Sequence, residues 1–204
     1  MRFKFFFIII AVHAVLITIL FFKSGIRIDG EAQKYISAAK LISEQSDFSG
    51  LSRHSFYSSY ILLLAFLFKV GLEFNGIIIF QLLLNLLCAY FVFALLIRLT
   101  MRIQIGYYGS LFFLLCLPIQ QWVLALYTES FFICLLVIFS FLLTGKQTAT
   151  KVIVLTIIGL LLAFCRPIGI FIAIGGFFVG TQLVSKKCNL LTSLALFFSL
   201  LQFF

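Results

Sequence analysis

The chain has 204 residues, of which 64% are hydrophobic and 10% are charged, and its net charge is +9 at pH 7. The mean hydropathy is +1.24, and so few polar residues cannot cover the surface of a water-soluble domain. We therefore predict an integral membrane protein in contact with a lipid bilayer. The basic residues flank apolar runs, as topology signals and headgroup contacts do, so no nucleic-acid partner is expected.

Three uncharged runs reach the length of roughly 18 residues that marks a spanning helix. They cover residues 5–22, 74–97 and 103–127. The first run follows Arg2 and Lys4, and no small-residue cleavage site comes after it. We therefore predict an uncleaved first membrane helix over residues 1–22.

Residues 23–55 form the long polar segment and hold four of the six acidic residues, including Asp29. After Asp29, apolar residues recur at helical spacing, which predicts an amphipathic helix lying on the membrane with Asp29 at its start. The residues on that face are Ala32, Tyr35, Ile36, Ala39 and Ile42. Residues 47–55 are rich in Ser and Gly, as a loop is.

The apolar run 56–70 decides the topology. In a first arrangement the N-terminus is cytoplasmic, and residues 23–73 form an extracytoplasmic loop in which 56–70 is an interfacial or re-entrant helix. In a second, the N-terminus is outside and 56–70 spans. The five basic residues of 23–55 favour the second arrangement by the positive-inside rule, whereas the short apolar length favours the first.

Residues 74–204 are expected to supply the remaining membrane helices. Pro118 predicts a kink late in the run 103–127, which places Glu129 at the outer surface in either topology. Arg166 is the one charge in 152–185, a stretch long enough for two short or tilted helices. The run 189–204 ends without a polar tail, so we expect an incomplete chain. The fold class is thus all-α, a single transmembrane bundle of about six or seven membrane helices.

The basic residues of the later connections fall on one side if the apolar segments between them run out and back in pairs. The positive-inside rule makes that side cytoplasmic. These residues are Arg98, Arg102, Lys146, Lys151, Lys186 and Lys187.

The candidate site is suggested by charged residues near the membrane, because burying a charge there costs free energy and such charges are usually functional or paired. In the first arrangement Asp29, Glu129 and Arg166 converge on the outer face. Asp29 is a candidate general base for an acceptor hydroxyl, and Arg166 suits a phosphate, which it can bind bidentately. Their candidate substrate-binding neighbours are His54, Tyr57, Gln121 and Tyr127.

Each candidate has a simpler interpretation. Asp29 can act as a helix N-cap, and Glu129 with Arg166 can be an ion pair between helices. Tyr127 suits an aromatic belt at the membrane surface. The five cysteines are scattered singly and the two histidines are far apart, so no zinc or haem site is expected, while a divalent metal at Glu129 stays open.

Three segments carry a resemblance to known enzymes: Ile-Asp-Gly-Glu-Ala-Gln-Lys-Tyr at 28–35, Tyr-Thr-Glu-Ser-Phe-Phe at 127–132 and Ala-Phe-Cys-Arg-Pro-Ile-Gly at 163–169. In order and spacing, over residues 1–185, they resemble the polytopic glycosyltransferases of the GT-C fold. The similarity is greatest to bacterial mannosyltransferase-like proteins and to the family of the second mannosyltransferase of glycolipid-anchor assembly.

The resemblance implies the first topology and an inverting transfer of a sugar, mannose being the one these families suggest. The donor would be a polyprenyl-phosphate sugar and the acceptor a glycan, lipid or protein on the extracytoplasmic face of a bacterial inner membrane. Asp29 matches the catalytic acidic residue of the first loop, Glu129 a second acidic position and Arg166 a basic position suited to the lipid phosphate. The chain is shorter than such enzymes, which carry further helices.

Two other functions fit the same residues. In a transporter or flippase for lipid-linked saccharides, Glu129 and Arg166 would line a path and Asp29 would only cap a helix. The short length also fits a non-catalytic membrane assembly subunit.

Overall fold

The computed structural model describes residues 2–145 and 148–184, and in these residues every regular element is a helix, which confirms the all-α class. The predicted run 189–204 lies outside the described residues. The elements are α1 (Arg2–Ser24), α2 (Gly30–Gln45), α3 (Ser49–Arg53), η1 (Ser55–Tyr57), α4 (Ser58–Lys69), α5 (Phe74–Thr100), α6 (Ile103–Leu115), α7 (Leu117–Gln120), η2 (Gln121–Leu124), α8 (Thr128–Leu143), α9 (Ala149–Ala163) and α10 (Pro167–Val184).

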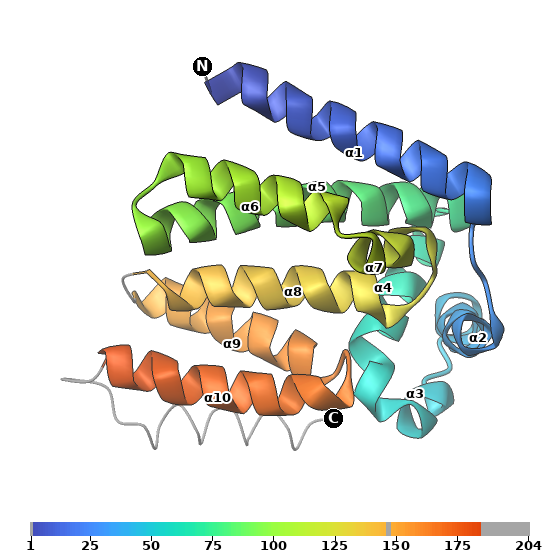
Figure 1. Ribbon diagram of the computed structural model, residues 1–204. Helices are drawn as coiled ribbons and strands as arrows, with labels where there is room; N and C mark the ends of the chain where they lie inside the picture. Colours follow the sequence, from blue (N-terminus) through green and yellow to red (C-terminus); the bar gives the residue numbers. More distant parts are fainter. Residues whose placement is uncertain (1, 146–147, 185–204) are drawn as a thin grey trace.

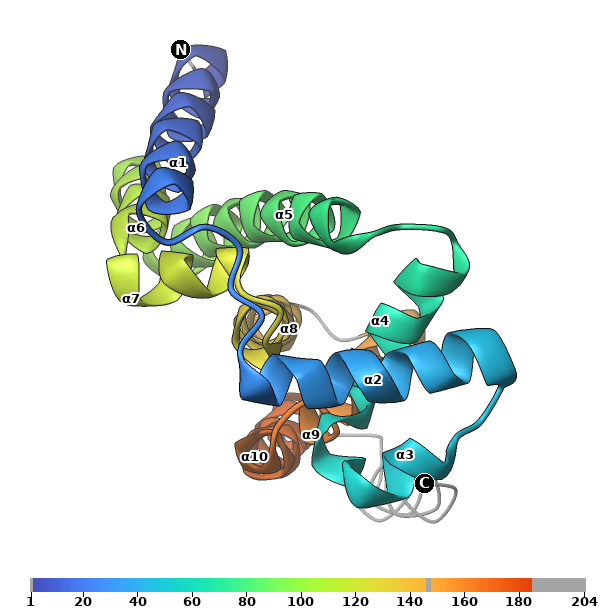
Figure 2. The same ribbon diagram turned by 90° about the vertical axis from the view of Figure 1, so that its right-hand side faces the viewer.

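The longer helices form a bundle with the remaining helices gathered at one end. α5 packs on α6 and α8, α9 packs on α8 and α10, and α1 contacts α6. In Figure 1, α8, α9 and α10 run back and forth between the two ends, while α2, α3 and α4 lie together at the end where α1 finishes. Figure 2 looks onto that end and shows α2 lying across it. The polar segment predicted around Asp29 is therefore a cap on one end of the bundle.

Two described helices are long and apolar enough to cross a membrane, namely Phe7–Ser24 within α1 and the 27-residue α5. A third span results if α6 and the segment Leu117–Leu124, which is bent from it by 58°, count as one. Four more apolar helices are shorter. Long apolar helices of this kind indicate a membrane protein.

The amphipathic helix forms as predicted, but a different partner covers its apolar face. In α2, Ala32, Tyr35, Ile36 and Ala39 are buried, and α2 packs against α4. Ala32 and Ala39 are fully buried on this face. This face is therefore covered by protein, whereas we expected it to lie on the membrane.

The run that decides the topology is a short helix placed across the bundle end. α4 has 12 residues, a length of about 18 Å, whereas the apolar core of a bilayer is about 30 Å thick. Both of its ends lie at the end of the bundle that carries α2 and α3 (Figures 1 and 2). This geometry fits the interfacial or re-entrant arrangement, and the side of the membrane on which it lies stays a prediction.

The predicted kink at Pro118 is a real break between α6 and α7. Buried amides replace the hydrogen bonds that a continuous helix would make. Asn85 of α5 donates to Gln120 Oε1 at 2.7 Å, and Gln120 donates to the carbonyl of Phe113 at 3.0 Å. Such pairing is what allows irregular backbone inside an apolar bundle.

Gln81, one turn before Asn85 on α5, continues this support. With its amide oriented to satisfy both ends, its nitrogen donates to the carbonyls of Val123 and Ala125 at 3.1 and 3.2 Å. Its oxygen accepts from the Tyr60 hydroxyl of α4 at 3.1 Å. Gln81 thus joins three parts of the chain at the capped end of the bundle.

Arg98, Arg102 and Lys151 lie at the opposite end of the bundle, near the α5–α6 connection and the start of α9 (Figure 1). Arg98 donates to the backbone carbonyl of Phe141 at 2.8 Å. The Arg98 guanidinium also lies 3.9 Å from the centroid of the Phe141 ring. The other basic residues predicted for this side, Lys146, Lys186 and Lys187, lie outside the described residues.

The packing of α10 against the end of α9 can be tested at two glycines of α10. A Cβ at Gly169 would meet the backbone of Leu162, 2.6 Å from its carbonyl carbon, whereas one at Gly175 would meet nothing within 4 Å. We expect Gly169→Ala to lower the melting temperature in detergent by about 5 °C, since backbone cannot move aside cheaply. Gly175→Ala, the control, should leave it unchanged or raise it slightly. Equal effects of the two substitutions would contradict the close approach at Gly169.

Candidate active site

Three segments that are far apart in the sequence meet at the capped end of the bundle. They are the start of α8, the turn between α9 and α10, and the start of α4. The Ser59 amide donates to the carbonyl of Phe164 at 3.1 Å, and the Cys165 thiol donates to the carbonyl of Thr128 at 3.8 Å. These contacts place the turn that carries Arg166 beside the first turn of α8.

Arg166 and Glu129 form an ion pair, with 2.9 Å between Arg166 Nη1 and Glu129 Oε1. Their side chains are 35% and 19% exposed. Glu129 lies in the first turn of α8, where the helix dipole favours a negative charge. The ion pair considered from the sequence is thus present, and it leaves the arginine partly open to solvent or to a ligand.

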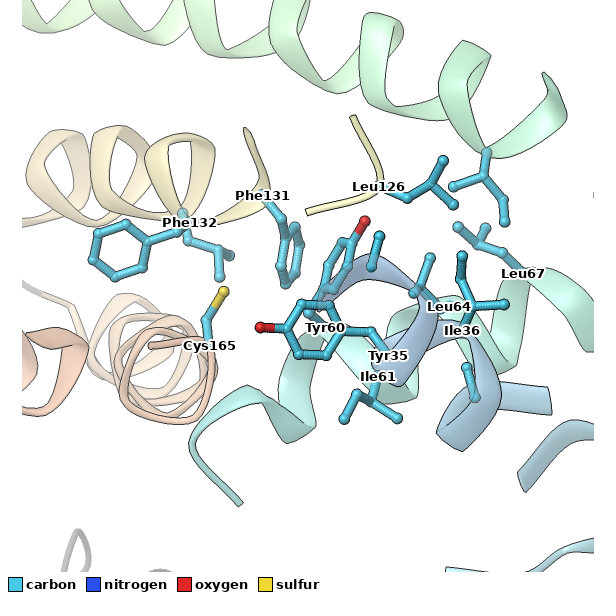
Figure 3. Close-up of a cluster of buried hydrophobic side chains, with 14 of the residues drawn as sticks. Tyr35, Ile36, Tyr60, Ile61, Leu64, Leu67, Leu126, Phe131, Phe132 and Cys165 are labelled. Carbon is cyan, nitrogen blue, oxygen red and sulfur yellow. The ribbon is translucent and has the colours of Figure 1, made fainter. Parts of the chain in front are cut away.

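Tyr35 of α2 lies at the centre of an aromatic cluster near this ion pair. Its ring centroid is 5.3 Å from that of Tyr57, 6.1 Å from that of Tyr60 and 6.5 Å from that of His54. Figure 3 shows the Tyr35 and Tyr60 rings side by side, next to Phe131 and to Cys165 of the α9–α10 turn. The predicted neighbours His54 and Tyr57 are therefore joined to the site through Tyr35.

The Tyr35 hydroxyl lies within the electrostatic field of the ion pair. Burial raises its pKa most, and the negative charges of Glu31 and Glu129 raise it further. The positive charge of Arg166 acts in the opposite direction. The phenol therefore stays protonated well above neutral pH and keeps a hydrogen-bond donor near Glu129 and Arg166.

Asp29 is placed by a short backbone pairing rather than by its own side chain. The Arg27 amide donates to the Leu124 carbonyl at 3.0 Å, and the Leu126 amide donates to the Arg27 carbonyl at 3.2 Å. These bonds form an isolated parallel bridge between Arg27 and Ala125. Asp29 follows two residues later, so the bridge holds it beside the segment that leads to Glu129.

The Asp29 carboxylate does not cap α2. The residue occupies the N-cap position but makes no side-chain capping bond. Its Oδ2 atom instead pairs with Arg27 Nη2 at 3.2 Å, and the side chain is 55% exposed. The N-cap interpretation is therefore correct for the position and wrong for the side chain, which remains accessible to a substrate.

Tyr127, the residue before α8, lies in the electrostatic field of both predicted catalytic carboxylates. Burial raises the pKa of its phenol, and the negative charges of Asp29, Glu31 and Glu129 raise it further. Arg27 acts in the opposite direction. The charges of Asp29 and Glu129 thus both act on this phenol, and the backbone bridge between Arg27 and Ala125 brings the segments before the two carboxylates side by side.

Gln121 is the predicted neighbour that the fold does not bring to this cluster. It is exposed, and its amide donates to the Pro118 carbonyl at 3.4 Å. The next residue, Trp122, reaches Tyr127 instead, with 5.5 Å between ring centroids.

Sequence reasoning missed Arg27, which pairs with Asp29 and lies 5.7 Å from the Trp122 ring centroid. The alternation of apolar and charged residues over 26–29 is typical of an extended strand and was the available signal. Tyr35 and Tyr60 were also missed as members of the site, because their spacing indicates only a buried helix face.

The described residues hold no group of three or more His, Cys, Asp or Glu side chains placed to bind a metal ion. Burial raises the pKa of the Cys165 thiol to about 12, so this cysteine is not a thiolate nucleophile at neutral pH. A divalent metal acting with Glu129 stays a prediction.

Comparison of the chain with models of protein families, with curated proteins and with solved structures found no match. The resemblance to GT-C glycosyltransferases therefore rests on the three segments that carry it.

A double-mutant cycle tests the ion pair of the site. We expect Glu129→Gln and Arg166→Gln to show a coupling of about 1 kcal/mol in the free energy of unfolding, because both side chains are partly shielded from water. The more exposed pair Arg27–Asp29, changed to Gln and Asn, is the control and should couple by less than about 0.5 kcal/mol. Coupling at Arg27–Asp29 as strong as at Glu129–Arg166 would contradict the placement of the inner pair.

Proposed function

We propose that the chain is the membrane module of a glycosyltransferase that takes a sugar from a polyprenyl-phosphate donor. Mannose is the sugar that the sequence resemblance suggests, and the acceptor is a glycan, lipid or protein. One observation carries the proposal: Asp29, Glu129 and Arg166 come from three distant segments and gather at the bundle end opposite Arg98, Arg102 and Lys151.

In this proposal Asp29 is the general base. Its carboxylate takes the proton of the acceptor hydroxyl while that oxygen bonds to the anomeric carbon of the sugar. The bond from this carbon to the phosphate oxygen breaks, and the phosphate leaves with the electron pair, so the configuration inverts. The exposure of Asp29 and its lack of a capping bond support this role, because the carboxylate has only the Arg27 ion pair to hold it.

Arg166 would bind the phosphate of the donor. Its guanidinium has five N–H donors, of which the ion pair with Glu129 uses only part. The planar group can therefore keep Glu129 and still present donors to a phosphate. Glu129 would be a positioning residue, since its ion pair holds the Arg166 guanidinium in the site.

The proposal also assigns a membrane arrangement. α1, α5, the bent segment α6–η2, and the shorter α8, α9 and α10 would make six membrane helices, in keeping with the predicted six or seven. Helices of 15–18 residues span about 23–27 Å and require some local thinning of the bilayer. Arg98, Arg102 and Lys151 would then be cytoplasmic by the positive-inside rule, which puts the site on the extracytoplasmic face of a bacterial inner membrane.

Cysteine accessibility tests this arrangement. In a cysteine-free background, single cysteines at positions 29, 129 and 102 are labelled in intact cells with a membrane-impermeant maleimide. We expect labelling from outside at 29 and 129, and labelling at 102 only after the membrane is opened. Labelling of 29 and 129 from opposite sides would rule out a shared site.

Substitution of the base tests the chemistry. Asp29→Asn should lower sugar transfer in reconstituted membranes by roughly 10²- to 10⁴-fold, because the amide cannot accept the proton. Glu31→Gln removes the same charge from an exposed position in the first turn of α2 and is the control. Unchanged transfer by Asp29→Asn would refute the assignment. Movement of the donor lipid across the membrane without sugar transfer would indicate a transporter.

A further inference from the structure

A polar groove of about 390 Å³ lies between α2 and α3, and sites for small molecules typically range over about 300–1,000 Å³. The chain forms it by a tight reversal. Ser46 adopts a left-handed conformation (φ 55°) at the end of α2. The Asp47 carboxylate then accepts from the backbone amide of Ser49 at 2.8 Å and from its hydroxyl at 3.0 Å, which fixes the start of α3.

α2 and α3 approach closely at two residues that line the groove. A Cβ at Gly50 of α3 would lie only 3.2 Å from Ala38 Cβ on α2. Glycine at this position therefore allows α3 to pack directly on α2. The groove is thus a defined feature of the packing between two elements.

The groove carries positive charge. Lys34 from α2 and Arg53 from α3 line it, and none of its lining residues is acidic. The ion pairs in the described part of the chain are Arg27–Asp29 and Arg166–Glu129, so neither groove cation takes part in one. Gly30 also lines the groove, so it opens at the positive end of the α2 helix dipole.

The groove lies next to residues of the candidate active site. It begins at Gly30, directly after Asp29, whose own charge is paired with Arg27. At its other side His54 contacts the Tyr35 ring, which lies in the field of Glu129 and Arg166. A molecule held by Lys34 and Arg53 would therefore extend toward Asp29.

We propose that this groove binds the phosphate group of an anionic molecule. Two cations on facing walls, a helix N-terminus and the absence of an acidic lining residue are the features that recognise phosphate. If the proposed function holds, on which this part rests, the molecule is the acceptor, and its phosphate is held so that a hydroxyl reaches Asp29. The donor phosphate would occupy Arg166, so the two substrates would have separate anion sites.

Direct binding tests the groove without reference to catalysis. The full chain in a neutral detergent is titrated with inorganic pyrophosphate at low ionic strength, where exposed charges are least screened. We expect the double variant Lys34→Gln, Arg53→Gln to bind about tenfold more weakly than the wild type, since each exposed charge contributes modestly. The double variant Lys23→Gln, Arg102→Gln removes the same charges from exposed positions outside the groove and should bind within twofold of the wild type.

A second titration uses vesicles of phosphatidylglycerol against vesicles of phosphatidylcholine, with the protein in nanodiscs of neutral lipid. Loss of pyrophosphate binding in the groove variant supports a site for phosphate in soluble molecules. Loss confined to phosphatidylglycerol vesicles supports a lipid headgroup as its source. No binding by the wild type to either probe, or equal losses in the two double variants, would overturn the proposal.

The anion site and the proposed function can fail independently in these experiments. Asp29→Asn should keep pyrophosphate binding while losing transfer. Full transfer by Asp29→Asn together with an intact groove effect would reject Asp29 as the base and retain the anion site. Absence of transfer by the wild type together with an intact groove effect would reject the enzyme and retain the anion site. Normal binding by the groove variant together with inactive Asp29→Asn would reject the anion site alone.

Discussion

The structure depends on how an apolar bundle tolerates a broken helix. The backbone between α6 and α8 leaves helical geometry near Pro118, and its polar groups need partners because little water reaches the interior. Asn85 and Gln81 on α5 supply them, through Gln120 and through the carbonyls of Val123 and Ala125. After the short helices α7 and η2, residues 125–127 are therefore held in an extended form until α8 begins.

The extended residues 125–127 determine where the candidate site lies. They pair with Arg27, which brings the chain after α1 to the start of α8, and they end at Tyr127 beside Glu129. Gln81 also accepts from Tyr60 of α4, and Tyr60 packs against Tyr35 of α2. Gln81, one of the two α5 residues that stabilise the break, thus also holds the cap of α2 and α4.

The sequence was sufficient for features that depend on local pattern. Composition predicted the membrane class, Pro118 predicted the kink, and helical spacing after Asp29 predicted the buried face of α2. What covers that face was not predictable, because apolar residues at helical spacing can be buried either by a membrane surface or by another apolar helix, here α4. The same limit applied to run 56–70, whose orientation across the bundle end comes from contacts with α2 and the α9–α10 turn.

The site was predictable in part for a related reason. Asp29, Glu129 and Arg166 were noticeable because charges are rare in this chain, and rarity can be read from sequence. Gln81 and Asn85 were not noticed, since an amide in an apolar helix carries no sign of which distant carbonyl it binds. Gln121 was chosen for its place next to a kink, but the turn directs Trp122 toward Tyr127.

The bridge between Arg27 and Ala125 uses only main-chain atoms. The side chains of Leu124 and Leu126 are buried in the core, but they take no part in these hydrogen bonds. The bridge itself requires only that residue 126 keeps an amide hydrogen. The segments before Asp29 and before Glu129 are far apart in the sequence, but this bridge joins them into one structural unit. Two backbone features, an extended segment before Asp29 and a broken helix before Glu129, would therefore identify relatives of this chain better than the side chains of the paired segments.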